Sequence, residues 1–377
     1  MHYRKFGKDK FQSSILGFGA MRLPLNSQDT ADIDLPQATR MIRLAVDSGI
    51  NYIDTAYGYH NGKSETAVGQ ALRDGYREKV RLATKLPYWA VNSPEDMDRI
   101  FAEQLTRLET GKIDYYLLHA LSKTAWDKLK GFKVLEWAQS KLNAGQIGSL
   151  GFSFHDGPEV FKQIIDEHAW DFCQIQYNYM DTENQAGAQG LEYAASKNIP
   201  VVVMEPLRGG SLANPLENIR EIFTKSGITR TPAEWALLWA WSQPGISLVL
   251  SGMSNLEQVR DNLRIAENSG SWKLSENDLK IIAEVKKAYL DSKAIDCTQC
   301  GYCMPCSYGV NIPANFAMYN EAERYNNYNG PKWQYANRLK EGERAAACTG
   351  CRRCLTKCPQ KLEIPDQLEK VHQALKS

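Results

Sequence analysis

The sequence predicts an α/β fold, a closed (β/α)8 TIM barrel followed by a small, mainly helical domain. Between residues 14 and about 254, short apolar runs alternate with amphipathic segments of helical period, which is typical of repeated βα units. Eight such units over about 250 residues fit a barrel. Eight of the nine cysteines lie beyond residue 292. We therefore expect a barrel at 1–291 and a second domain at 292–377.

Eight apolar segments are expected to form the barrel strands, because each is short and rich in β-branched or aromatic residues. In chain order they are residues 14–19, 51–56, 80–86, 114–120, 147–153, 171–178, 199–206 and 247–253. Between them, segments such as 36–49, 93–109 and 255–268 carry apolar residues at intervals of three and four. This spacing predicts helices that pack one face against the strands.

A doubly wound parallel sheet is the competing fold, and it usually carries the pattern GxGxxG after its first strand. Here the first strand ends with Gly17, Phe18 and Gly19, and Arg22 stands where the third glycine would be. The pattern is incomplete, so the barrel is favoured.

The second domain is defined by two runs of four cysteines. The runs are Cys297, Cys300, Cys303 and Cys306, then Cys348, Cys351, Cys354 and Cys358. The second run, CxxCxxCxxxCP, matches the bacterial ferredoxin pattern, in which the fourth cysteine of each run binds the cluster of the other run. The tail therefore predicts a ferredoxin-like domain with two 4Fe-4S clusters. One would be held by Cys297, Cys300, Cys303 and Cys358, the other by Cys348, Cys351, Cys354 and Cys306.

The first run departs from this pattern, since only two residues separate its last two cysteines and Ser307 stands where proline is usual. Two zinc ions remain an alternative for the eight thiols. A disulfide framework would need an oxidising compartment. The chain starts MHYRKFGKDK, without the apolar stretch of a signal peptide, so we expect a cytoplasmic protein with reduced thiols. Cys173 lies alone in an apolar run and is expected to be buried and inert.

The tail between the runs is rich in helix formers, at 312–325 and 331–347, which predicts helices rather than a small sheet.

Charge and hydropathy exclude two classes of partner. The chain has 45 Lys and Arg against 44 Asp and Glu, so no global basic field favours nucleic acid. No apolar run approaches the length of a membrane span, so no membrane partner is expected.

Four polar residues stand at or just after the predicted ends of strands 2, 3 and 4. They are Asp54, Tyr59, Lys85 and His119. Catalytic groups of a barrel gather at this end of the strands. A buried ionisable group needs a partner, and Asp54 and Lys85 are on neighbouring strands, which lie about 4.8 Å apart. Each residue alone has a purely structural explanation, such as a core salt bridge, but together they predict an active site.

The stretch 54–59 resembles the DTAxxYG motif of the aldo-keto reductase superfamily, and Lys85 in ATKLP and His119 in LLHAL also match. The resemblance spans roughly residues 3–290. It departs after the tyrosine, where His60 replaces the glycine. With the cysteine tail, the chain resembles the branch of this superfamily that has a C-terminal ferredoxin-like domain.

The resemblance implies hydride transfer between NAD(P)H and a small-molecule carbonyl or alcohol substrate. Tyr59 would be the proton donor, made more acidic by the Lys85 cation. Asp54 would hold Lys85 in place, and His119 would hydrogen-bond the substrate oxygen.

The resemblance also implies NADP or NAD bound across the barrel mouth. The matching cofactor positions are Gly19, Met21, Asp54, Ser153, Gln174, Met204, Pro206, Leu207, Ser251, Gly252, Ser254, Gln258 and Asn262. Met204 stands where many relatives stack an aromatic ring, and Phe154 replaces an amide-bearing residue. Gly252 and Gln258 stand where many NADP-dependent relatives have Lys or Arg, so the choice between NADP and NAD stays open.

Hydride carries two electrons, whereas each cluster passes one, and the sequence shows no flavin fingerprint. The clusters are expected to exchange electrons with a separate redox carrier protein, or to serve as structure and docking surface. The basic residues at 352, 353, 357 and 361 form either a face for an acidic partner or an ordinary solvated surface. Two other functions remain open: an electron-carrier or nucleotide-sensing redox protein, and an epimerase or eliminase that recycles tightly bound NAD(P).

Overall fold

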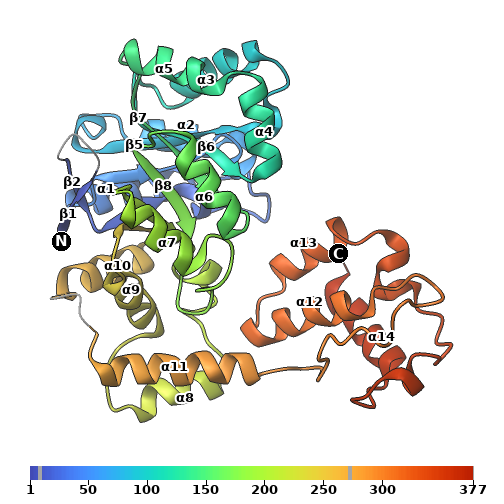
Figure 1. Ribbon diagram of the computed structural model, residues 1–377. Helices are drawn as coiled ribbons and strands as arrows, with labels where there is room; N and C mark the ends of the chain where they lie inside the picture. Colours follow the sequence, from blue (N-terminus) through green and yellow to red (C-terminus); the bar gives the residue numbers. More distant parts are fainter. Residues whose placement is uncertain (7–10, 271–273, 377) are drawn as a thin grey trace. The chain divides into compact units, whose positions relative to one another are not determined.

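The structure of the protein, a computed structural model, describes residues 1–6, 11–270 and 274–376 (Figure 1). Within these ranges, no helix combines the length and the apolar character that crossing a bilayer would require.

The chain forms two compact units. The first comprises residues 1–209 and 233–274, and the second comprises 210–232 and 275–377. The second unit thus includes two segments that precede the cysteine-containing tail.

The first unit contains eight parallel strands that close into a barrel, as the sequence predicts (Figure 1). Each strand pairs with the next one along the chain, and the last strand closes the ring against the first. The strands are β3 (Leu16–Gly19), β4 (Tyr52–Asp54), β5 (Arg81–Pro87), β6 (Ile113–Leu121), β7 (Ile147–Phe154), β8 (Phe172–Gln176), β9 (Val201–Met204) and β10 (Ile246–Gly252). All eight predicted strands are therefore confirmed.

Helices join successive strands and cover the outside of the barrel, which explains why the strands are apolar on both faces. They are α1 (Leu35–Asp47), α2 (Ser64–Ala71), α3 (Pro94–Arg107), α4 (Lys123–Gly131), α5 (Val134–Asn143), α6 (Pro158–Glu167), α7 (Gly187–Ser196), α9 (Pro232–Ser242) and α10 (Leu256–Asn268). Short 3-10 turns follow several strands: η1 (Ala20–Arg22), η2 (Tyr59–Gly62), η4 (Tyr88–Ala90) and η5 (Arg208–Gly210), with η3 (Arg77–Lys79) just before β5.

Side-chain hydrogen bonds at the helix starts show why α1 and α10 begin where they do. At α1 the Asp34 carboxylate accepts a hydrogen bond from the Gln37 N–H at 3.0 Å, and Pro36 occupies the first turn. At α10 the Asn255 side chain accepts from the Gln258 N–H at 2.9 Å.

A β-hairpin at the N-terminus, formed by β1 (Tyr3–Phe6) and β2 (Phe11–Ser14), was not predicted. Phe6 is fully buried and packs against three aromatic rings, Tyr52, Tyr115 and Phe172, with centroids 5.1 to 5.9 Å apart. These rings lie near the starts of their strands, so the hairpin closes the N-terminal end of the barrel. Four-residue strands with mixed polarity gave too short a pattern to detect.

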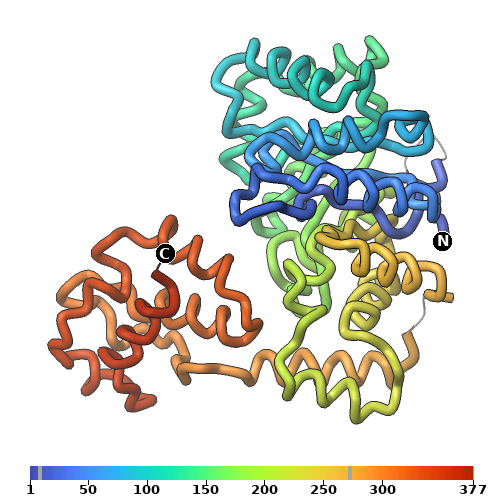
Figure 2. Tube along the Cα trace, turned by 180° about the vertical axis from the view of Figure 1, so that it is seen from behind, coloured from blue at the N-terminus to red at the C-terminus, as the bar shows by residue number. Residues whose placement is uncertain are grey.

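The second unit is helical in its described residues, as predicted for the tail. Two of its helices, α8 (Glu217–Lys225) and α11 (Glu276–Asp291), lie side by side (Figure 2). An ion pair of 2.7 Å joins Arg230 to Asp278 at the start of α11. The remaining elements are α12 (Ile312–Tyr325), α13 (Asn329–Asn337) and α14 (Ile364–Leu375), with the short turns η6 (Glu341–Glu343), η7 (Ala345–Ala347) and η8 (Leu355–Lys357).

The tail has its own small core. Val310, Phe316, Leu368, Val371 and Leu375 are almost completely buried, and most of the cysteines of both runs pack against this core. The sulfur-bearing loops and the apolar helix faces therefore form one packed region. Whatever binds the cysteines is expected to stabilise the helices as well.

Replacing Phe6 with alanine tests the closure of the barrel floor. The truncation leaves a cavity among three rings, so we expect the free energy of unfolding to fall by about 3–5 kcal/mol. Urea unfolding followed by circular dichroism measures it. Lys5→Ala, an exposed residue of the same strand, is the control and should change it by less than about 0.5 kcal/mol. An equal effect of the two substitutions would contradict the packing argument.

Candidate functional site

The four polar residues predicted at the strand ends lie together at the C-terminal end of the barrel. Asp54 is the last residue of β4, and Tyr59 begins the turn η2 that follows it. Lys85 lies toward the end of β5, and His119 toward the end of β6, where it is in register with Pro87. Because parallel strands end at one rim, their order along the chain becomes a cluster in space.

Lys85 is at the centre of this cluster. Its Nζ lies 2.6 Å from Asp54 Oδ1, 2.8 Å from the Thr55 carbonyl oxygen and 3.4 Å from the Tyr59 hydroxyl. The side chains of Lys85 and Asp54 are 1% and 4% exposed. Burial would lower the pKa of Lys85, but its interactions with the Asp54 carboxylate and the Tyr59 oxygen outweigh burial and the pKa is raised. The ammonium is therefore charged at neutral pH.

The pKa of Tyr59 differs from the sequence-based expectation. The Lys85 cation does lower it, as predicted, but burial of the phenol raises it more, and the net pKa lies above the usual value. Burial also raises the pKa of Asp54, against the pull of Lys85. The phenol thus holds its proton at neutral pH while it stays close to a fixed cation.

His119 closes the cluster on the side of β6. Its ring lies edge-on to Tyr59, with centroids 5.9 Å apart, and 4.9 Å from the ring of Trp89. Burial and the nearby Lys85 and His155 hold the pKa of His119 well below its usual value, so the ring is neutral. Its Nδ1 is buried and has no hydrogen-bond partner. Trp89, by contrast, is 48% exposed, which leaves an aromatic surface beside the imidazole.

A second layer of buried polar residues supports Lys85 from behind, and sequence reasoning missed it. Gln104 Nε2 on α3 donates to the Lys85 carbonyl oxygen and to Glu65 Oε1, each at 2.9 Å. Glu65 also accepts from Thr84 at 2.7 Å, and the Tyr116 hydroxyl donates to Gln104 Oε1 at 2.7 Å. In the sequence, the only indication of this layer is that Glu65 and Gln104 occupy the apolar faces of their helices.

His60, which replaces the glycine of the resembled motif, ties two loops together. The Leu23 N–H donates to His60 Nε2 at 3.1 Å, and Nδ1 lies 2.7 Å from the Thr30 carbonyl oxygen. These contacts require a neutral ring protonated at Nδ1. The loop after β3 is thereby fixed to the turn that carries Tyr59.

The residues predicted to hold a cofactor lie toward the same end of the barrel, on strands β3, β4, β7, β8, β9 and β10 or in the segments that follow them. Ser153 and Gln174 are register partners on neighbouring strands, and Gly19 and Gly252 are partners on β3 and β10. Met204 ends β9, and Pro206 and Leu207 follow it. Met21 is 58% exposed in the turn after β3.

Several of the predicted cofactor residues make contacts within the protein. Asn262 donates to the Ser251 hydroxyl at 2.9 Å, and Gln258 Oε1 accepts from the Ser254 N–H at 2.8 Å. Both bonds organise the first turns of α10. Gln174 is different, because its Oε1 is buried and has no hydrogen-bond partner. An orphaned amide oxygen of this kind is satisfied when a ligand donates to it, so this position fits the carboxamide of a nicotinamide.

Arg22 is a further residue at this end, and the sequence analysis gave it no role. It is exposed, and its carbonyl oxygen accepts from the Ser254 hydroxyl at 2.9 Å. A methyl group added at Gly252 would lie 3.2 Å from Arg22 Cδ, and one at Gly209 would lie 3.0 Å from its Nη2. The guanidinium thus lies over Gly209, which follows β9, and the aliphatic stem of Arg22 lies over Gly252 at the end of β10. In the sequence, the only indication of a role for Arg22 is that it stands where the third glycine of GxGxxG would be.

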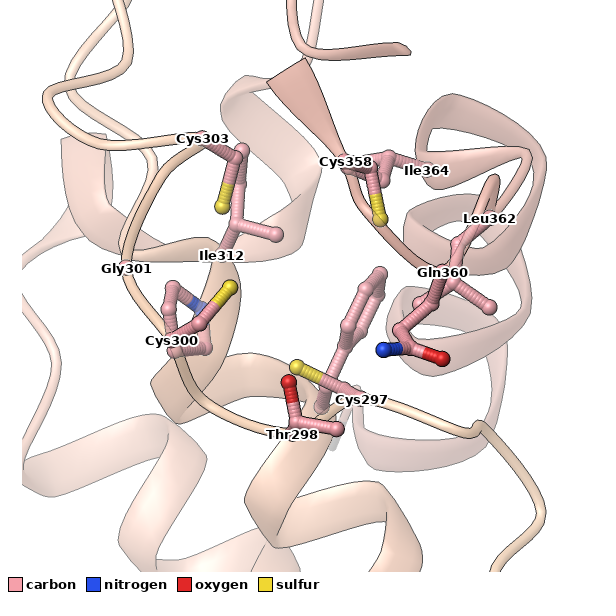
Figure 3. Close-up of a pocket in the computed structure, with 12 residues that line it drawn as sticks. Cys297, Thr298, Cys300, Gly301, Cys303, Ile312, Cys358, Gln360, Leu362 and Ile364 are labelled. Atoms are coloured by element: carbon pink, nitrogen blue, oxygen red, sulfur yellow. The ribbon is translucent and has the colours of Figure 1, made fainter. Parts of the chain in front are cut away.

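The cysteines of the tail line two cavities. Figure 3 shows Cys297, Cys300, Cys303 and Cys358 around the first, with their sulfur atoms directed toward the space between them. The second cavity is lined by Cys303, Cys306, Cys348, Cys351 and Cys354. The structure therefore brings the fourth cysteine of each run to the other run, as the spacing predicts. All nine cysteines are free thiols.

The chemistry of the first cavity fits an iron-sulfur cluster. Apart from its four sulfurs it is lined by uncharged side chains, with Ile312, Phe316, Leu362 and Ile364 among them, and by no carboxylate or imidazole. Soft thiolate donors select zinc or iron-sulfur clusters over hard cations. Among the described residues, no group of three or more His, Cys, Asp or Glu side chains is arranged to bind a single metal ion. A cluster spreads its thiolates over four irons instead of one ion.

Comparison with known proteins agrees with both parts of the chain. Residues 15–287 match the aldo/keto reductase family, and residues 296–363 match the 4Fe-4S dicluster domain. A curated relative, the methylglyoxal reductase YeaE of Escherichia coli K12, is 27% identical over 266 residues, which cover 68% of this chain and 86% of the relative.

Solved structures show the same barrel. The holo form of an aldo-keto reductase from Bacillus halodurans aligns with a TM-score of 0.63 at 25% identity, and covers 76% of this chain and 96% of its own. An aldo-keto reductase from Klebsiella pneumoniae in complex with NADPH aligns with a TM-score of 0.60 at 23% identity, again over 76% of this chain and 96% of its own. By its barrel and by the family that residues 15–287 match, the chain belongs to the aldo/keto reductase family, and it carries a C-terminal domain of the 4Fe-4S type.

Proposed function

We propose that this aldo/keto reductase family oxidoreductase transfers hydride between NAD(P)H and the carbonyl carbon of a small aldehyde or ketone, or oxidises the matching alcohol. The observation that carries the proposal is the contact of 3.4 Å between the Lys85 ammonium and the Tyr59 hydroxyl at the end of the barrel. A phenol close to a buried, paired cation can give up its proton when a neighbouring oxygen gains negative charge.

Bound NAD(P)H supplies the hydride, and the protein manages the charge on the substrate oxygen. Tyr59 donates the proton to that oxygen, and Lys85 stabilises the phenolate that remains. Asp54 keeps Lys85 charged and fixed through their bond of 2.6 Å. His119 is neutral, so it orients the oxygen with a ring N–H and does not compete with Tyr59 as the acid.

The cofactor is held by residues on β3 and β7–β10 or just after these strands. The unsatisfied Oε1 of Gln174 accepts from the nicotinamide carboxamide, with Ser153 beside it. Gly19, Gly252, Ser251 and Asn262 form the bed near the start of α10, whose free N–H groups favour phosphate. Met21, Met204, Pro206, Leu207, Ser254 and Gln258 complete the predicted set.

Arg22 supplies the cation that positions 252 and 258 lack. Its guanidinium lies over Gly209 and its aliphatic stem over Gly252, where a phosphate of the dinucleotide can pass close to the backbone. An arginine forms bidentate, charge-assisted hydrogen bonds to phosphate. We therefore include Arg22 among the cofactor-binding residues.

The two cysteine cavities each hold one 4Fe-4S cluster in this proposal, and the clusters exchange single electrons with a separate carrier protein. Cys297, Cys300, Cys303 and Cys358 bind the first, and Cys306, Cys348, Cys351 and Cys354 bind the second. The support is that each cavity gathers three sulfurs from one run and at least one from the other. The boundary at 291/292 remains the proposed functional division between barrel and cluster domain.

Tyr59→Phe tests the proton donor. Loss of the hydroxyl should lower kcat for reduction of methylglyoxal by NADPH by about 10²–10⁴-fold, because general acid catalysis contributes that much. NADPH affinity, measured by fluorescence titration, should stay within twofold. Tyr57→Phe is the control, since the Tyr57 hydroxyl donates to Glu103 at 2.7 Å and is not bonded to Lys85. A Tyr59→Phe enzyme with wild-type turnover would exclude this role and favour a sensor.

Arg22→Gln tests the phosphate contact. A lost charge-assisted bond contributes about 1.5–3 kcal/mol, so the Kd for NADPH should rise at least tenfold. Lys112→Gln, just before β6 at the opposite end of the barrel, should leave the Kd unchanged. An unchanged Kd in the Arg22 variant would remove this residue from the cofactor site. The same titration with NADH shows whether the contact is to the 2′-phosphate or to the pyrophosphate.

Iron and acid-labile sulfide counts on anaerobically prepared protein test the two clusters. Two 4Fe-4S clusters require about eight irons and eight sulfides per chain. Cys358→Ser should lower both counts by about half, because only one cavity loses a ligand. Cys173→Ala, which alters a buried thiol on β8, should keep the full count. Two zinc ions without sulfide would contradict the assignment.

A further inference from the structure

The two cysteine cavities differ sharply in charge. No charged side chain lines the first cavity. The second is lined by three cations, Arg352, Arg353 and Lys357, together with the aromatic ring of Tyr308. The sequence shows the same contrast, since residues 297–311 contain no charged residue, whereas residues 344–362 contain five cations and no acid. We call Arg352, Arg353 and Lys357 the cationic rim.

The cationic rim is available to a partner. All three side chains are exposed, and none forms an ion pair with another described residue. Arg353 donates to the Ser307 hydroxyl at 3.2 Å, and its guanidinium lies 6.0 Å from the centre of the Tyr308 ring, which holds it beside the cavity. Tyr308 is itself 45% exposed, and Cys351 of the second run is also exposed. These three cations line a cavity whose lining includes no acidic side chain.

We propose that the cationic rim is the docking surface for an acidic one-electron carrier protein, and that electrons pass through the cluster bound by Cys306, Cys348, Cys351 and Cys354. The proposal rests on the proposed function, in which that cavity holds a cluster. Charge complementarity identifies the partner, because an unpaired cationic surface speeds encounter with an acidic protein and orients it. Tyr308, Pro305 and Pro365 supply the uncharged contact that interfaces place beside such charges.

The electron balance of the exchange is simple. One electron leaves the reduced carrier and enters the cluster, so the carrier is oxidised and the cluster reduced by one, and no covalent bond changes. The rim favours this direction, since nearby cations stabilise the more negative, reduced state of a cluster. The cluster of the first cavity has no such cations. It follows that the cluster beside the rim has the higher reduction potential of the two.

Stopped-flow reduction of the loaded protein tests the docking surface. The probe is a reduced, acidic [2Fe-2S] ferredoxin at low ionic strength. Charge reversal of the rim, in the triple variant Arg352→Glu, Arg353→Glu and Lys357→Glu, should lower the second-order rate constant at least tenfold. Added salt should slow the wild type and should not slow the variant.

A matched triple variant is the control. Lys332→Glu, Lys370→Glu and Lys376→Glu reverse three exposed cations of the same unit that line neither cavity, and should leave the rate constant within twofold. Reduced methyl viologen, a small cation, should reduce both variants at least as fast as the wild type. Equal rates with ferredoxin for the rim variant and the wild type would overturn the proposal. So would a wild type that viologen reduces and ferredoxin does not.

A redox titration followed by electron paramagnetic resonance tests the potentials. Neutralising the rim with Arg352→Gln, Arg353→Gln and Lys357→Gln should shift one of the two potentials, the higher one, to more negative values and leave the other in place. Two unshifted potentials would contradict the electrostatic role of the rim. Iron and sulfide counts on each variant separate these outcomes from failure of the proposed function, because protein without clusters contradicts that function and not the charge argument.

Discussion

The candidate active site depends on one constraint, the burial of the Lys85 ammonium at the end of the barrel. A cation removed from water must be paired and hydrogen-bonded, or it loses its proton. Asp54 supplies the opposite charge at 2.6 Å, and the Thr55 carbonyl oxygen supplies a further acceptor. The Tyr59 hydroxyl is the remaining neighbour. The fold thus uses a phenol to complete the surroundings of a cation, and this is what gives the phenol its chemistry.

The precision of that arrangement comes from elements that never touch the reacting groups. Gln104 holds the backbone of Lys85 and is itself held by Tyr116 and Glu65. At the other side, His60 fixes the loop after β3 to the turn of Tyr59. Buried polar networks of this kind are costly unless every member is satisfied, and they then allow one arrangement only. A misplaced lysine would leave several of these groups unpaired at once.

The cysteine-rich tail follows a different principle. Its apolar core is small, and the sulfur-bearing loops pack directly on it. Bound clusters would therefore contribute to stability and to function through the same thiolates. The contrast between one uncharged and one cationic cavity shows that two similar ligand sets need not be equivalent. Their difference arises from side chains between and after the cysteines, not from the ligands.

The sequence by itself determined the barrel, the helical tail and the grouping of the cysteines, because strand period, helix period and CxxC spacing are local properties of the chain. It also indicated Asp54, Tyr59, Lys85 and His119, since polar residues in apolar strands are conspicuous. Only the tertiary structure decided the rest. The barrel floor under Phe6, the support of Lys85 by Gln104, the position of Arg22 over two glycines and the raised pKa of Tyr59 all depend on contacts between distant segments. Burial and distance arise only when those segments meet, so no local pattern encodes them.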